Sequence, residues 1–190
     1  MGRIIVSESV TLDGVVQDPT GDEGFSRGGW FGQVGDMDQR AWAKVELDEA
    51  LGAEALLLGR RTYQFFAARW PSRTGQWPDR LNRMPKYVVS ATLQDPRWNN
   101  STVLSGDVVP AVSALRRRIN GDVVVYASFQ LVRALLAHDL VDELRLIVYP
   151  FVLGAGERLF DDAGCEKRVR LVDARTVGDG LAALTYQPAG

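Results

Sequence analysis

Residues 56–66 read LLLGRRTYQFF, and this stretch decides the fold that the sequence predicts. An apolar run ends at Gly59 and passes directly into Arg60, Arg61 and a helical pattern. This order is typical of a phosphate-binding turn, because glycine lets a ligand approach the backbone, helix amides carry partial positive charge, and guanidinium groups pair with phosphate. A buried strand followed by two solvated arginines would give the same letters. The nucleotide hypothesis therefore depends on the rest of the chain.

Strand and helix patterns alternate on both sides of this turn. This alternation favours right-handed crossovers and a mostly parallel sheet, and the turn VGDGL near the C-terminus predicts a final antiparallel hairpin. The glycine-rich segment 15–37 is expected to be a long loop, and segment 70–78 to be irregular. Strands are expected at 3–10, 54–58, 86–90, 122–126, 143–154, 167–177 and 181–187, and helices at 38–51, 60–69, 107–120 and 128–140.

The length and composition indicate one compact domain and argue against several classes of partner. No linker divides the 190 residues, and the net charge of −2, with 22 basic and 24 acidic residues interspersed, argues against nucleic acid or an anionic membrane as partner. With Cys165 and His138 as the single cysteine and histidine, neither a disulfide framework nor a structural metal is expected. Cys165 is interpreted as an inert small residue. The first residues, MGRIIVSESV, lack a long apolar segment with a cleavage site, and no run of about 18 apolar residues occurs, so a cytoplasmic location is expected.

Three expected strands end in small or basic residues. Parallel strands deliver their C-terminal turns to one edge of a sheet, and ligands bind there. Arginines suit a phosphate ester, hydroxyl groups suit phosphate or ribose, and small residues with free amides suit a pyrophosphate. The turns are GRRT at 59–62, SAT at 90–92 and AS at 127–128. Together they predict a dinucleotide groove, although neither GxGxxG nor GxxxxGK[ST] is present.

The order TLDG, LLLGRRTY, KYVVSATL, VVVYAS and LVDELRLIVYPFVLGAGERLF resembles the dihydrofolate reductase-like superfamily. The sequence is most similar to the branch that contains the reductase domain of the bifunctional riboflavin-biosynthesis deaminase/reductase and its stand-alone relatives. The resemblance covers almost the whole chain. It implies a three-layer α/β fold with a mostly parallel central sheet, a C-terminal antiparallel hairpin and helices on both faces. It also implies a homodimer, to which strand 143–153 would contribute unless that strand is central in the monomer core.

The resemblance further implies NADPH as the cofactor, bound at the three turns. The arginine pair favours NADPH over NADH. Ala127 and Ser128 stand where the family usually has Gly-Gly or Gly-Ser, a departure expected to affect cofactor affinity more than the fold. The implied cofactor-binding residues are Gly59, Arg60, Arg61, Thr62, Ser90, Ala91, Thr92, Ala127, Ser128, Phe129, Gln130, Leu131 and Val16.

Candidate substrate-binding residues lie near the first strand and in the following loop. TLDG resembles the SLDG of the riboflavin-type branch, which places Asp13 near the nicotinamide end, with Ser9 and Val16 beside it. An ordinary turn aspartate is the alternative. Trp30, with Phe31, is predicted either to stack on a flat heterocycle or to anchor the loop.

The sequence assigns no catalytic residue. Dihydrofolate reductases place a carboxylate on the first helix, and the corresponding position here is Ala43, which cannot act as an acid. Glu46 and Asp48 lie nearby and could take that place only in a different register, so solvated helix charges are the favoured interpretation. This departure argues against folate reduction and for a relative with another substrate, in which a water could supply the proton.

The leading hypothesis is an NADPH-dependent oxidoreductase that transfers hydride to a flat pyrimidine- or pterin-like substrate. The nearest specific activity is 5-amino-6-(5-phosphoribosylamino)uracil reductase of riboflavin biosynthesis. The alternatives are a reductase of another small metabolite or xenobiotic, and a non-catalytic nucleotide-binding protein on the same fold. Ala43 and Ala127 are consistent with the last alternative.

Overall fold

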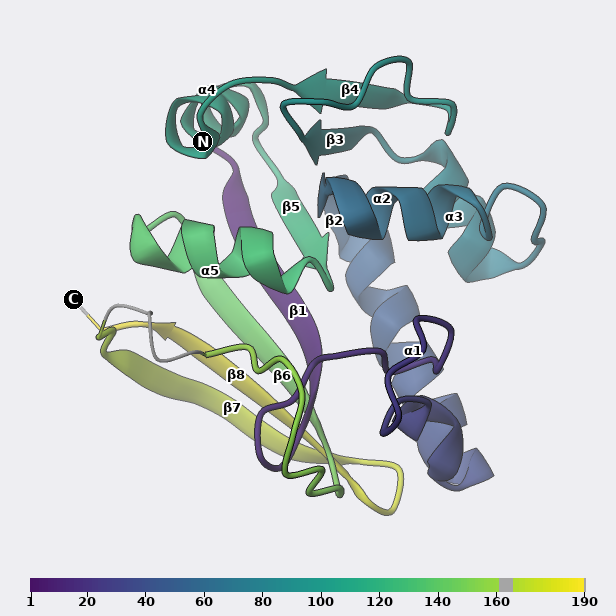
Figure 1. Ribbon diagram of the computed structural model, residues 1–190. Coiled ribbons are helices and arrows are strands. Elements are labelled where there is room, and N and C mark those ends of the chain that lie inside the picture. The colour runs from purple at the N-terminus through teal and green to yellow at the C-terminus, as the bar shows by residue number, and fades with distance from the viewer. Residues whose placement is uncertain (161–165, 190) are drawn as a thin grey trace.

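The computed structural model describes residues 1–160 and 166–189, so Cys165 lies outside the described residues. Within these residues, eight strands form one sheet in the order β4-β3-β2-β5-β1-β6-β8-β7 (Figure 1). The strands are β1 Arg3–Thr11, β2 Ala53–Gly59, β3 Lys86–Val89, β4 Ser101–Leu104, β5 Asp122–Tyr126, β6 Glu143–Tyr149, β7 Val169–Val177 and β8 Leu181–Pro188. The helices are η1 Trp30–Gln33, α1 Asp36–Gly52, α2 Arg60–Ala67, α3 Gln76–Arg83, α4 Val108–Arg118 and α5 Phe129–Ala137.

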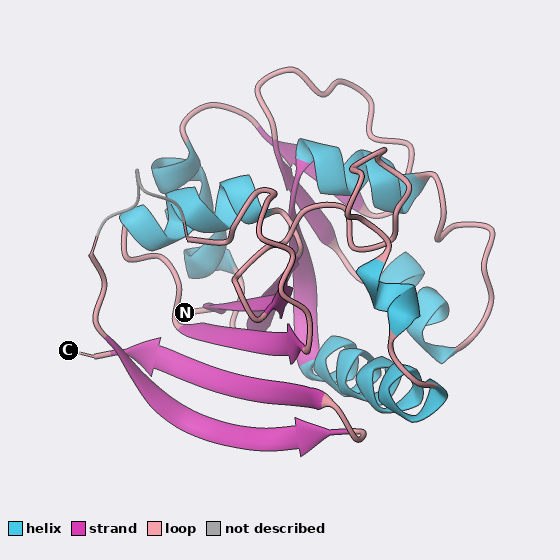
Figure 2. Cartoon of the chain, turned by 60° about the horizontal axis from the view of Figure 1, so that its bottom comes forward, coloured by secondary structure: helices cyan, strands magenta, loops and turns pink. Residues whose placement is uncertain are grey.

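The sheet is parallel from β4 to β6 and antiparallel in the final β6-β8-β7 segment. Helices α4 and α5 bury apolar side chains against one face, and α1, α2 and α3 pack on the other. Figure 2 shows helices on both sides of the strands, with the last two strands curving along the lower edge. The expected three-layer architecture with a C-terminal hairpin is therefore confirmed.

The pairing of β1 opens a cleft in the sheet. The β1–β5 register ends at Ser7 and Tyr126, whereas the β1–β6 register continues to Thr11 and Tyr149. In the described chain, residues 8–11 of β1 thus have no β5 partner on that side. The turn between β5 and α5 lies beside this gap, so side chains from β1 and from that turn meet there.

Besides the short helix η1 inside the expected loop 15–37, three segments differ from the sequence-based expectation. Helix α3 begins inside the segment expected to be irregular and continues to Arg83. Pro78 is tolerated because it occupies the first turn, where a helix needs no N–H donor. Strand β4 was not expected, since four residues at a sheet edge give almost no periodicity. The apolar run after Glu143 stops being a strand at Tyr149, because Pro150 cannot donate a ladder hydrogen bond.

The position of β6 settles one alternative about the apolar run at 143–153. Strand β6 lies between β1 and β8, so it is a central strand of the monomer rather than an exposed interface strand. The edge strand is β7, where Val169, Leu171 and Val172 expose large apolar side chains. No helix within residues 1–160 and 166–189 is long and apolar enough to cross a membrane.

Candidate functional site

Two adjoining cavities lie beside the turns that follow β2 and β5. The first, called the turn pocket, has a volume of about 480 Å³, and its lining includes residues 59–62 and 128–131. The second, called the aromatic pocket, has a volume of about 390 Å³ and extends over the gap beside β1. Four residues line both cavities: Arg61, Thr62, Ser128 and Phe129. The two spaces are therefore neighbours on one side of the molecule.

The turn pocket is built around a contact between the β2–α2 and β5–α5 turns. The Gly59 amide donates a hydrogen bond of 3.1 Å to Ser128 Oγ, which itself donates to the Tyr126 carbonyl at 3.2 Å. A Cβ added to Gly59 would lie 3.7 Å from the side chains of Ser128 and Leu131, so glycine keeps this space clear. Neither α2 nor α5 has a side-chain cap at its start. The first amides of both helices are thus free of capping side chains and suited to an anion.

The two arginines connect the turn pocket to other parts of the chain. The Arg60 guanidinium donates to the Thr92 hydroxyl and thereby joins the turn after β3 to this region. Arg61 is 62% exposed and pairs with Glu23 in the long loop. Ser90 uses its hydroxyl within its own turn, accepting hydrogen bonds from the amides of Thr92 and Leu93. Ser90, Ala91 and Thr92 stay outside the lining of the cavity itself.

The aromatic pocket is lined by rings from five segments of the chain. Arg69 lies over the Phe65 ring at 3.5 Å and Arg73 over the Trp70 ring at 4.7 Å, so cationic groups stand among the rings. A flat apolar ligand would gain contact area in such a cavity at little entropic cost. The lining rings are Phe31, Trp42, Phe65, Phe66, Trp70, Trp77, Tyr126 and Phe129.

Two buried glutamates also line the aromatic pocket. Burial raises the pKa of Glu8 to about 8, and its Oε2 has no hydrogen-bond partner among the described residues. Glu46 is 8% exposed, and burial, followed by the charges of Glu49 and Glu8, raises its pKa well above the usual value. Because desolvation disfavours the charged form, burial favours the neutral acid form of both carboxyl groups.

The interpretation of Glu46 as a solvated helix charge is therefore wrong. Asp48 does fit that interpretation, because its side chain is 60% exposed and pairs with Lys44 at 2.6 Å. A signal was present in the sequence, since Trp42, Glu46 and Ala50 are four residues apart and share one helix face. Neither Glu8 nor Glu46 was among the predicted site residues, and both are brought to the pocket by the fold.

The sequence matches the RibD C-terminal domain over residues 3–183. The chain belongs to the RibD C-terminal domain family. A similar full-length relative is the uncharacterized protein YyaP of Bacillus subtilis (strain 168), which is 25% identical over 194 residues that cover 97% of this chain and 94% of YyaP. The expected membership of the riboflavin-type reductase branch is confirmed by this match.

Solved structures share the fold of this RibD C-terminal domain protein. A putative riboflavin biosynthesis protein from Shewanella sp. PV-4 aligns with a TM-score of 0.78 and 20% identity, over 99% of both chains. Dihydrofolate reductase from Enterococcus faecalis, solved in complex with NADP(H) and RAB-propyl, aligns with a TM-score of 0.62 and 14% identity, over 100% of this chain and 98% of its own. The dihydrofolate reductase-like fold is thus shared over the whole length.

The family's glycine position in the β5–α5 turn is conformationally special in this RibD C-terminal domain. Ala127 has φ of 48° and Ser128 has φ of 62°, which are left-handed conformations that glycine adopts without strain. Ala127 and Ser128 therefore adopt a backbone conformation that is typical of glycine. Ala127 lines the aromatic pocket, while Phe129, Gln130 and Leu131 line the turn pocket.

The predicted substrate-side residues are divided between the pocket and its supports. Ser9 and Val16 line the aromatic pocket. Asp13 instead accepts hydrogen bonds from the Thr11 hydroxyl and from the amides of Leu153 and Gly154. Although desolvation acts to raise it, these hydrogen bonds lower the pKa of Asp13 to about 2. Asp13 thus ties the turn after β1 to the segment after β6 and lies outside the cavity lining.

Trp30 lies in the core rather than in the aromatic pocket. Its side chain is 0% exposed, its ring packs edge-on against Phe31 and Tyr149, and its indole N–H donates to the Gln17 carbonyl at 3.2 Å. Phe31, which follows it, does line the pocket. Trp30 therefore anchors the loop that presents Phe31, as the second sequence-based interpretation predicted.

Proposed function

We propose that this protein is an NADPH-dependent oxidoreductase that transfers hydride to a C=N or C=O bond of a flat pyrimidine- or pterin-like heterocycle. The nearest specific activity is 5-amino-6-(5-phosphoribosylamino)uracil reductase. The observation that carries the proposal is the pair of adjoining pockets with four shared lining residues. A nucleotide in the turn pocket and a flat substrate in the aromatic pocket would be in contact with each other. All 190 residues would form this one reductase domain.

The donor groups around the turn pocket support a dinucleotide as its ligand. Gly59 leaves space beside Ser128, and the first turns of α2 and α5 offer amides without side-chain caps. Arg60 and Arg61 would supply guanidinium groups for phosphate oxygens, which supports the choice of NADPH over NADH. Ser9 and Val16 would line the end nearer the substrate. When bound, NADPH would supply the hydride.

The aromatic pocket supports a flat substrate that takes up a proton. Rings such as Trp42 and Trp77 would hold the substrate by stacking and exclude water. Glu46, a buried carboxylic acid in this lining, would donate the proton to the nitrogen or oxygen of the reduced bond. Glu8 would help to keep the proton on Glu46, because a second negative charge nearby disfavours ionisation of Glu46. Glu46 is thus our proposed proton donor, a role for which the sequence alone suggested no residue.

The direct test is turnover with a candidate substrate. The wild type should consume NADPH in the presence of 5-amino-6-(5-phosphoribosylamino)uracil or a pterin. Glu46→Gln should lower this rate by about a hundredfold, the usual contribution of a general acid. Arg60→Ala combined with Arg61→Ala should lose NADPH binding while the fold remains intact. Binding of NADPH without turnover of any pyrimidine or pterin would favour a different metabolite or a non-catalytic role.

We also propose a homodimer, in which the exposed edge strand β7 contributes. Val169, Leu171 and Val172 each expose between 45% and 50% of their surface on this strand. Long apolar edges are commonly paired or covered in stable proteins. In analytical ultracentrifugation, the wild type should sediment as a dimer. The Leu171→Lys variant should dissociate at a higher protein concentration than the wild type does.

A further inference from the structure

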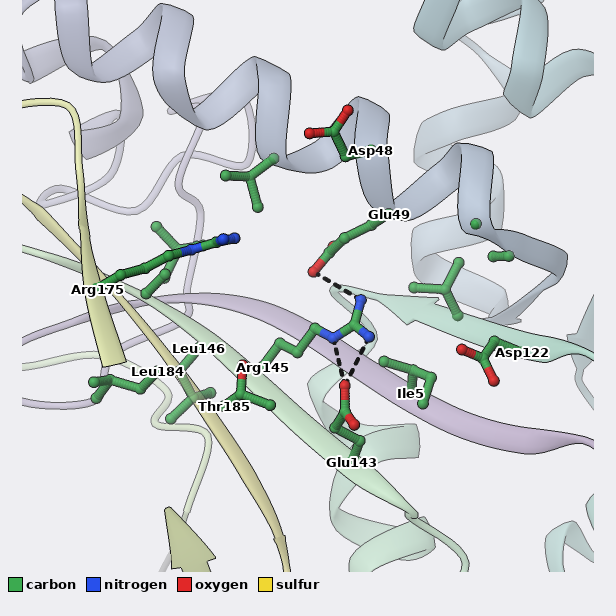
Figure 3. A pocket seen from close by; sticks show the side chains of 16 residues that line it. Ile5, Asp48, Glu49, Asp122, Glu143, Arg145, Leu146, Arg175, Leu184 and Thr185 are labelled. Carbon is green, nitrogen blue, oxygen red and sulfur yellow. Dashed lines mark hydrogen bonds and ion pairs between the residues drawn. The ribbon is translucent and has the colours of Figure 1, made fainter. Parts of the chain in front are cut away.

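A third cavity, called the rear pocket, lies between α1 and the strands at the end away from the loop that follows β1. It has a volume of about 410 Å³, and its lining mixes apolar residues of the sheet with charged side chains. Figure 3 shows Glu49 extending from α1 toward Arg145, which also bonds to Glu143. The charged residues of the lining are Asp48, Glu49, Asp122, Glu143, Arg145 and Arg175. The proposed reaction uses none of them.

Glu49 is held in this pocket by a cation. Its side chain is 8% exposed, and Oε1 lies 3.3 Å from Nη1 of Arg145. Arg145 in turn lies 2.7 Å from Glu143, so its guanidinium is fixed between two carboxylates. Oε2 of Glu49 has no hydrogen-bond partner among the described residues. Burial raises the pKa of Glu49, while Ser7 and Arg145 act in the opposite direction. Glu49 is thus a buried carboxyl with one side occupied by a positive charge.

Helix α1 places Glu46 and Glu49 side by side but in different pockets. The two residues are three positions apart, so their side chains leave neighbouring positions of the same helix face. Glu46 lines the aromatic pocket, whereas Glu49 lines the rear pocket. Beneath them, Ser7 of β1 is flanked in register by Tyr126 and Arg145. The active-site acid and the Arg145-bound acid are therefore separated by less than one helical turn.

The charges around the two glutamates favour an unequal distribution of protons. Two neighbouring carboxyl groups cannot both ionise cheaply in a low-dielectric site. Burial raises the pKa of Glu49, but Arg145 contacts Glu49 and opposes this shift by favouring the ionised form. The negative charge of an ionised Glu49 in turn disfavours ionisation of Glu46. The Tyr126 hydroxyl donates a hydrogen bond of 3.3 Å to the backbone carbonyl of Glu46. This hydrogen bond therefore does not engage the Glu46 carboxyl group. The titratable and charged groups that act on this pair are Glu8, Tyr126, Arg145, Tyr149 and Arg175.

We propose that Glu49, fixed by Arg145 behind α1, is a positioning residue that keeps the proton on Glu46 in the aromatic pocket. Its role in catalysis rests on the proposed function. In turnover, the reduced bond would gain hydride from NADPH and a proton from the Glu46 carboxyl, and the resulting carboxylate would regain its proton from water. Glu49 itself would touch neither substrate nor cofactor.

The test is an infrared pH titration of the whole protein without cofactor, following the carbonyl band of protonated carboxyl groups. Glu46→Gln identifies the part of the band that belongs to Glu46. In Glu49→Gln the Glu46 midpoint should fall by about one pH unit or more, because a like charge has been removed. Glu49→Asp, which retains the charge, should restore most of the wild-type midpoint. If the glutamine variant does not fold, Glu49→Ala replaces it, because Arg145 keeps Glu143 as its partner.

The matched control is Asp48→Asn, which removes the same charge from the adjacent residue of the same pocket. Asp48 is exposed and paired with Lys44, so its removal should leave the Glu46 midpoint nearly unchanged. An unchanged midpoint in Glu49→Gln, or an equal shift in Asp48→Asn, would overturn the proposal. Because the titration contains no NADPH, failure of cofactor binding would count against the proposed function and not against this electrostatic role.

Discussion

Arg61 and Glu23 form a two-point ion pair, with Nε 3.1 Å from one carboxylate oxygen and Nη2 2.9 Å from the other. Arg61 lines both the turn pocket and the aromatic pocket, and Glu23 lines the aromatic pocket. A phosphate group that binds Arg61 must therefore share the guanidinium with Glu23 or displace it. The loop that carries Glu23 is in this way linked to the proposed cofactor site.

Glu23→Gln should tighten NADPH binding. An exposed ion pair is worth about 0.2–1 kcal/mol, so its removal should lower Kd by up to about fivefold. Tryptophan fluorescence titration with NADPH measures the change. Asp22→Asn is the matched control, because Asp22 pairs at 3.0 Å with Arg69, which lies outside the turn pocket. Equal NADPH affinity in both variants would show that Glu23 does not compete for Arg61.

Gly59→Ala should weaken NADPH binding several-fold without loss of stability. Gly59 has φ of −73°, which alanine adopts freely, and the added methyl group would occupy space beside Ser128 and Leu131. Binding titration and thermal unfolding test the two halves of this prediction. Gly52→Ala, at a position where an added Cβ meets nothing within 4 Å, should leave binding unchanged. Wild-type affinity in Gly59→Ala would remove the turn pocket from the proposed cofactor site.

Ala127→Gly should stabilise the fold slightly. Removing the backbone strain of an alanine in the left-handed conformation should stabilise the folded state by about 1–2 kcal/mol. The greater conformational freedom of glycine in the unfolded chain offsets about 0.5–1 kcal/mol of this gain. The free energy of unfolding should therefore rise by roughly 0.5 kcal/mol. Ala134→Gly, inside helix α5, should instead lower it by about 1 kcal/mol. Chemical denaturation of both variants gives the comparison, and destabilisation of the same size at both positions would contradict the strain at Ala127.

Stability should fall between about pH 5 and 8, in part because of Glu8. An unfolded glutamate titrates near about pH 4.3, whereas burial raises the Glu8 pKa to about 8 in the folded protein. The folded state thus retains a proton that the unfolded chain releases in this window, and stability decreases as pH rises by up to about 1.4 kcal/mol per unit. Glu8→Gln should reduce this slope, as measured by denaturant unfolding at several pH values. Replacement of the exposed Glu166 by glutamine should not, and a wild-type slope in Glu8→Gln would refute the assignment.

Much of the fold follows from local sequence patterns. The strand expected at 122–126 is observed as Asp122–Tyr126. A run of valines bounded by turn residues is typical of a short buried strand. The Gly59 turn is also where the sequence placed it, since an apolar run and a helix meet there. Helix α3 and strand β4 were missed because a proline obscured the first and four residues are too few to reveal the second.

The chemistry of the aromatic pocket was less predictable. Glu8 is an ordinary polar residue in the sequence, and Glu46 is marked only by the helix face that it shares with Trp42 and Ala50. The burial of both carboxyl groups follows from how α1 covers the gap beside β1. Trp30 and Asp13 are conspicuous in the sequence, yet one packs in the core and the other fixes a turn. Such roles depend on contacts between residues far apart in the chain, which periodicity and turn motifs do not encode.

The central claim is that the turn pocket binds NADPH, and a paired titration with NADPH and NADH tests it most directly. Five tryptophans, three of which line the aromatic pocket, provide the fluorescence signal and energy transfer to the nicotinamide. The account predicts tight binding of NADPH and much weaker binding of NADH, because Arg60 and Arg61 would contact the additional phosphate. Absence of binding by either nucleotide, with the protein folded, would contradict it.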